Sequence, residues 1–165
     1  MAGTFAPTSA LRGLAWGLDG TALVLAGALL TISHFRRGND LVAAGFLVFV
    51  AGQALVLSGA AMELAASAPS FAAGAGLWAA ALALISAPRV MPRWVRGVGF
   101  IAAVLFALAA LRTFAGHALT PLSRPLPFFA YPFLVAALLG WAWDDYRMAP
   151  TRHAEADSTA RSASA

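Results

Sequence analysis

Five long apolar stretches, separated by short polar segments, dominate the pattern of this 165-residue chain. Each is close to the ~20 residues that an α-helix needs to cross ~30 Å of hydrocarbon. The expected membrane-spanning helices cover residues 11–33, 41–62, 67–86, 98–119 and 126–143. The pattern predicts an all-α integral membrane protein with a bundle of five transmembrane helices. Residues 1–149 would form this single helical domain, and the small polar residues of 150–165 predict a disordered cytoplasmic tail.

Composition supports this class of protein. Hydrophobic residues make up 61% of the chain and the mean hydropathy is +0.77, whereas soluble domains are about 45–50% apolar. A secretory signal peptide is the alternative for the first stretch, but Asp19 interrupts that stretch and no small-x-small cleavage site precedes polar sequence. Cysteine is absent, which excludes disulfides, thiol catalysis and sulfur-ligated metals.

The distribution of arginine predicts how the bundle is oriented. Of the 11 basic residues, eight lie in the first loop, the third loop and the C-terminal tail, which are expected on the same side of the membrane, while Arg12 and Arg124 lie on the other. An excess of basic residues in short loops marks the cytoplasmic face. We therefore expect the N-terminus outside and the C-terminus inside, in the inner (plasma) membrane of a bacterium. The arginines form no continuous basic face, so nucleic acid is not an expected partner.

Three of these arginines follow the third apolar stretch within a few residues of one another. Arg89, Arg93 and Arg96 would share one face of a short helical segment. Such a segment is expected to lie at the membrane interface and contact anionic lipid headgroups. A solvated loop without lipid contact is the alternative.

Glycines mark the expected helix-packing surfaces, because lipid provides no hydrophobic drive between helices and close backbone approach matters more. One stripe of small residues lies in the first apolar stretch and another in the second. The two stripes are Gly13, Gly17, Gly20 and Gly27, and Gly45, Gly52 and Gly59. We expect them to pack the first helix on the second. The alternative is oligomerisation through one stripe, as a homo-oligomer or within a larger membrane complex.

Asp19 and Arg112 are the only charged residues that lie well inside the apolar stretches. Asp19 lies seven residues after Arg12 and Arg112 lies seven residues before Leu119, so each is expected ~10 Å below the outer surface. Gln53 lies slightly deeper, and His117 and Glu63 lie near the outer rim, so polar groups would gather in the outer half of the bundle. Charged groups at membrane depth are costly and are candidates for a functional site.

Three interpretations of the two charges stay open. In the first, Arg112 extends its long side chain to the headgroups and Asp19 pairs with Arg12 on the same helical face. In the second, Asp19 and Arg112 form a buried ion pair that holds the bundle together. In the third, they line a path for an ion or a substrate.

The sequence contains no Ser/His/Asp arrangement, no metal-spaced cluster and no Gly-rich phosphate loop. The histidines lie at different depths, which disfavours a bis-histidine haem. We expect no cofactor, metal or catalytic residue, and the favoured function is a small non-catalytic accessory or assembly subunit. One alternative is a small oligomeric transporter or channel that uses Asp19, Gln53, Arg112 and His117. Another is a membrane enzyme that uses His117 and Glu63.

Overall fold

The computed structural model describes residues 8–59, 62, 64–117 and 130–147, and all regular structure in these segments is helical. The labelled helices are α1 (Ser9–Arg36), α2 (Asp40–Ser58), α3 (Leu64–Ser86) and α4 (Arg93–Phe114). A further helix, here called the C-terminal helix, covers residues 130–147. The predicted all-helical fold is confirmed, and α1 to α4 are each long and apolar enough to cross a membrane.

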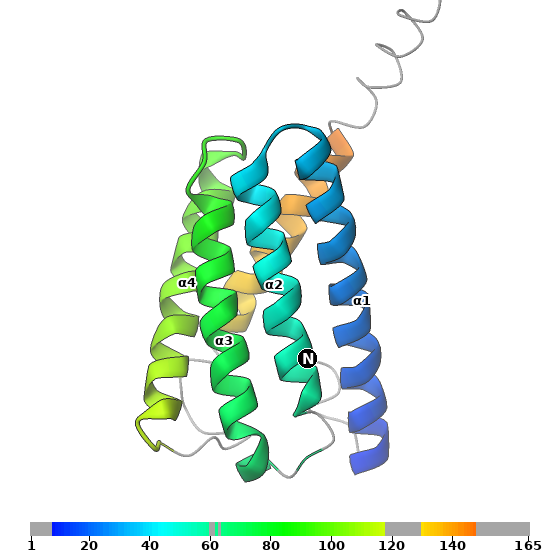
Figure 1. Cartoon of the computed structure of the whole chain (residues 1–165), viewed down its shortest axis with the longest axis vertical. Coiled ribbons are helices and arrows are strands. Elements are labelled where there is room, and N and C mark those ends of the chain that lie inside the picture. Colours follow the sequence, from blue (N-terminus) through cyan, green and yellow to red (C-terminus); the bar gives the residue numbers. More distant parts are fainter. Residues whose placement is uncertain (1–7, 60–61, 63, 118–129, 148–165) are drawn as a thin grey trace, which may run out of the picture.

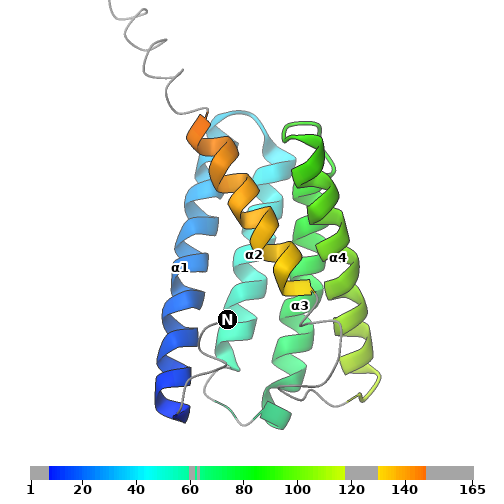
Figure 2. The same ribbon diagram turned by 180° about the vertical axis from the view of Figure 1, so that it is seen from behind.

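Helices α1 to α4 stand side by side in chain order, and neighbouring helices run in opposite directions (Figure 1). Among these four, only consecutive helices are in contact, so α1 and α4 form the two edges of the layer. The C-terminal helix lies across the back of the layer and runs diagonally, with its last turn beside the end of α1 (Figure 2).

Aromatic side chains join the C-terminal helix to the layer. Ala130, Leu134, Ala137 and Trp141 are buried, and their spacing places them on one helical face. The Trp141 ring meets the ring of Phe46 edge-on, with 4.9 Å between centroids. Such edge-to-face pairs are favourable beyond the area that they bury. The buried face therefore fixes the C-terminal helix against the layer.

Helix α1 packs on α2, as predicted, and Gly20 and Gly27 lie at this contact, but the glycines of α2 face α3. A Cβ atom on Gly45 would lie 2.6 Å from Ile85 Cγ1, and a Cβ atom on Gly52 would lie 2.9 Å from the carbonyl oxygen of Gly74. A Cβ atom on Gly59 would lie 3.1 Å from the Cβ atom of Ser67. Helix α2 lies between α1 and α3, and it turns its glycines toward α3.

The glycines of α1 divide into two pairs. Gly20 and Gly27 are buried against α2, where a Cβ atom on Gly27 would lie 2.7 Å from Val50 Cγ2. A Cβ atom on Gly13 or Gly17 would meet no atom within 4 Å among the described parts of the chain. Gly20 and Gly27 thus pack on α2, and Gly13 and Gly17 continue the same helical face toward the start of α1.

The helix bounds differ from the predicted ranges by up to five residues, and the difference is clearest in α4 and α2. Helix α4 begins at Arg93, directly after Pro92, and ends at Phe114, so it lies five residues earlier than the range 98–119. Proline favours a helix start because its φ is already close to the helical value. Gly116, with φ 84°, follows the last turn in the left-handed conformation that terminates many helices. Helix α2 similarly ends at Ser58 rather than at residue 62. The predicted tail, 150–165, lies outside the described residues.

Candidate functional site

The structure does not bring Asp19 and Arg112 together. Both residues are exposed, and they lie on α1 and α4, the two edges of the layer, which are not in contact. Their positions along the helices also differ. Arg112 is two residues from the end of α4, or ~3 Å along its axis, whereas Asp19 is ten residues from the start of α1, or ~15 Å. The equal depth predicted from the apolar pattern is therefore not matched by equal distances from the helix ends.

The other members of the predicted polar cluster are also dispersed. Gln53 is buried on α2, and its Nε2 atom would lie 2.9 Å from a Cβ atom on Gly20 of α1. Its Oε1 atom has no hydrogen-bond partner among the described atoms. His117 is exposed beyond the end of α4. Glu63 lies outside the described residues, so the described members form no single site.

Polar contacts are instead concentrated at the opposite end of the bundle. The α1–α2 loop, the α3–α4 loop and the end of the C-terminal helix all lie at this end (Figures 1 and 2). We call it the arginine-rich end. Its arginines in the described segments are Arg36, Arg37, Arg89, Arg93, Arg96 and Arg147.

An ion pair at the arginine-rich end links α1 to the C-terminal helix. The Nη2 atom of Arg37 pairs with Oδ1 of Asp145 and also donates a hydrogen bond of 2.8 Å to Ser33 Oγ. The two charged side chains are 17% and 22% exposed, so water only partly screens them. The sequence shows an acidic pair beside several arginines, but it does not show which arginine reaches the acid.

The carboxyl group next to this ion pair has a different environment. Asp144 lies just beyond the apolar part of the C-terminal helix, where partial burial and then the charge of Asp145 raise the pKa of its carboxyl. The guanidinium groups of Arg37 and Arg147 act in the opposite direction. The two adjacent acids therefore differ: Asp145 forms the ion pair, and Asp144 is held in a place that favours its neutral form.

The three arginines predicted to contact lipid headgroups do not share one environment. Arg96 donates from Nε to the carbonyl oxygen of Ser86 (2.8 Å) and from Nη2 to that of Ala87 (2.9 Å). These bonds satisfy carbonyl groups that the last turn of α3 leaves without helical partners. Arg89 and Arg93 are exposed. Contact between these two and lipid stays a prediction.

A buried histidine, which the sequence interpretation did not select, also lies toward the arginine-rich end. His34 is 2% exposed and stacks on Phe46, with 5.4 Å between ring centroids. Phe46 in turn contacts Trp141 of the C-terminal helix. In the sequence His34 is only a polar residue three positions before Arg37. Its stacking on Phe46 could therefore not be predicted.

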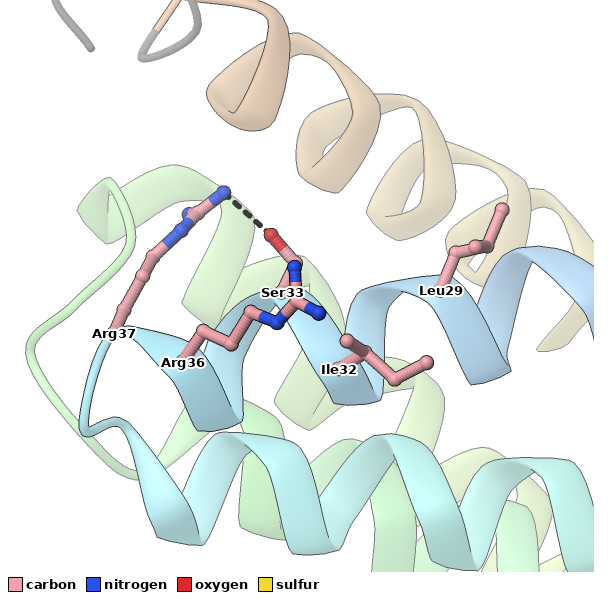
Figure 3. Close-up of a pocket in the computed structure, with 5 residues that line it drawn as sticks. All are labelled: Leu29, Ile32, Ser33, Arg36 and Arg37. Atoms are coloured by element: carbon pink, nitrogen blue, oxygen red, sulfur yellow. Dashed lines mark hydrogen bonds between the residues drawn. The ribbon is translucent and has the colours of Figure 1, made fainter. Parts of the chain in front are cut away.

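A surface pocket of about 410 Å³ adjoins this region. Its lining residues are Leu29, Ile32, Ser33, Arg36 and Arg37 (Figure 3). Two are apolar, one carries a hydroxyl group and two carry guanidinium groups. Within the described residues, no group of three or more His, Asp or Glu side chains is placed to hold a metal ion. The pocket is therefore suited to an anionic or amphipathic ligand.

Comparison of the chain with protein-family models, with curated proteins and with solved structures found no match.

Proposed function

We propose that the protein is a five-span membrane protein that acts as a non-catalytic accessory or assembly subunit, through association of its helices with other helices. Its N-terminus would lie outside and its C-terminus in the cytoplasm. The clustering of arginines at one end of the bundle supports this orientation, since basic residues favour the cytoplasmic face. Trp94, Trp143 and Tyr146 are exposed near the same end, as expected for aromatic residues at a membrane interface.

The open face of α1 is the observation that carries the proposal. Only 11% of the residues in the apolar stretch of α1 are buried, against 39, 44 and 39% in α2, α3 and α4. This edge helix exposes large apolar side chains along its length, on the side opposite its contact with α2. Gly13 and Gly17 continue the face of Gly20 and Gly27, and a Cβ atom on either would meet no described atom within 4 Å. Small residues four positions apart are typical of surfaces that associate in membranes.

The transporter alternative receives less support from the arrangement of the polar residues. Gln53 is buried against α1, while Asp19, Arg112 and His117 are exposed on two helices that do not touch. A path for an ion or substrate requires polar groups that follow one another through the bundle. The described members of the predicted cluster do not form such a path.

Crosslinking in native membranes, followed by gentle purification and mass measurement, tests the association. We expect an assembly larger than the monomer, which Gly17→Leu should disrupt because the added side chain would occupy space beside α1 that no described residue fills. Gly97→Leu is the matched control, since a Cβ atom on Gly97 of α4 also meets nothing within 4 Å. A native protein that is monomeric and crosslinks to no partner would contradict the proposal, as would equal effects of the two substitutions.

A further inference from the structure

The pocket between Leu29 and Arg37 suggests a specific ligand (Figure 3). We propose that it binds one anionic phospholipid from the leaflet at the arginine-rich end. The phosphodiester head would contact Arg36, and the upper part of an acyl chain would lie against Leu29 and Ile32. This site differs from the Arg89–Arg96 segment, where lipid contact was predicted from the sequence.

The order of the lining residues matches the order of groups in a phospholipid. Leu29, Ile32, Ser33 and Arg36 lie at positions i, i+3, i+4 and i+7 of α1, so they share one helical face. Along this face the side chains change from apolar to hydroxyl to guanidinium as the helix approaches its end. The distance from Leu29 to Arg36 along the axis is ~10 Å. A lipid in the same bilayer places its chain at the apolar level and its phosphate at the guanidinium level.

The guanidinium groups that line the pocket favour an anionic ligand. Arg36 is exposed, and its guanidinium forms no hydrogen bond or ion pair with any described residue. The Nη2 atom of the neighbouring Arg37 pairs with Asp145 and donates to Ser33, and its Nε and Nη1 atoms are buried. Arg37 thus offsets the charge of Asp145 and holds one wall of the pocket, and the charge of Arg36 is left for a ligand. A guanidinium presents donors in a planar fork that matches the oxygens of a phosphate group.

The size of the pocket supports a lipid head with part of its chain. At about 410 Å³ the pocket has room for a head group and part of a chain, and it is an open depression along α1 rather than an enclosed cavity. Non-specific attraction to an anionic membrane would involve all exposed arginines at this end alike. A pocket instead predicts that one lipid binds and that Arg36 matters more than Arg89 or Arg93.

Native mass spectrometry of the full-length protein in detergent tests the site. Phosphatidylglycerol and phosphatidylcholine with identical acyl chains are titrated in parallel, and the affinity of the first bound lipid is measured. We expect one phosphatidylglycerol to bind more tightly than phosphatidylcholine. Arg36→Gln should weaken it about fivefold or more, whereas Arg89→Gln, which removes an exposed arginine at the same end, should change it little. Ile32→Trp, which fills the pocket without changing its charge, should also weaken binding.

Three results would overturn the proposal. The first is equal affinity for the two lipids, and the second is an equal effect of Arg36→Gln and Arg89→Gln. The third is full competition by free glycerol phosphate at the concentration of the lipid, which would indicate an anion site that does not use the acyl chain. Loss of lipid binding in Arg36→Gln with an unchanged unfolding transition would confirm that the effect is local.

Discussion

The contact between α2 and α3 at Gly52 allows a quantitative prediction for Gly52→Ala. The added Cβ atom would lie 2.9 Å from the carbonyl oxygen of Gly74, 2.9 Å from Trp78 Cδ1 and 3.0 Å from Leu77 Cβ. The ordinary contact distance for a Cβ atom begins at 3.4 Å, so the two helices must separate by about 0.5 Å. Flexible side chains cannot absorb this shift, because one neighbour is backbone and another is a buried indole ring.

Overpacking of this kind costs about 1–3 kcal/mol. Alanine recovers about 0.5–1 kcal/mol relative to glycine inside a helix, so we expect Gly52→Ala to destabilise the protein by about 1–2 kcal/mol. The measurement is reversible unfolding in mixed micelles, followed by tryptophan fluorescence. Gly97→Ala is the matched control: its Cβ atom meets nothing within 4 Å, and it should be neutral or slightly stabilising. Equal stabilities of the two variants would refute the close approach of α2 and α3.

Three further substitutions test buried and partly buried polar groups in the same unfolding assay. Gln53→Met should stabilise the protein by about 1–2 kcal/mol, because it removes a buried Oε1 atom that has no described hydrogen-bond partner; a loss of stability would indicate a partner for this amide. Asp145→Asn should destabilise by about 1–3 kcal/mol through loss of a charge-assisted bond, and Arg37→Gln should then add little in a double-mutant cycle. Asp144→Asn should be more stable than the native protein at neutral pH, because a raised pKa in the folded state means that stability is lost as pH rises through that pKa. This advantage should disappear on acidification, and an advantage that is independent of pH would contradict the stated cause.

The length and apolarity of the helices could be predicted from the sequence, because both depend on local composition. The start of α4 could not be placed from hydropathy alone. Arg93 and Arg96 lie inside the helix although they are charged, since a helix can extend beyond its apolar part when its side chains reach polar partners. Arg96 does so through the carbonyl groups of Ser86 and Ala87. The apolar pattern places Arg112 seven residues from the end of its helix, whereas it lies two residues from the end of α4.

The predicted polar cluster did not form because the sequence does not specify which helices are neighbours. Equal depth would bring Asp19 and Arg112 together only if α1 and α4 were adjacent. In the structure α2 and α3 separate them, and each glycine contact involves one consecutive pair of helices. Most of the glycines selected from the sequence do lie at close helix contacts. Which helix each glycine meets could not be predicted, because it depends on the order of helices in the layer.

For the arginines, the rule that basic residues mark the cytoplasmic face and the structure give different information. The rule counts every basic residue near the helix ends, and this count predicts an orientation. The structure divides the same residues by their partners: Arg37 binds Asp145 and Ser33, Arg96 binds the end of α3, and Arg36 is exposed and lines the pocket. Orientation would depend on all of them, whereas lipid affinity would depend on those that the protein leaves available. Arg37→Gln should therefore lower the stability of the bundle more than Arg36→Gln, and Arg36→Gln should lower the affinity for phosphatidylglycerol more than Arg96→Gln. If both properties changed in parallel across the three variants, the division of roles would be wrong.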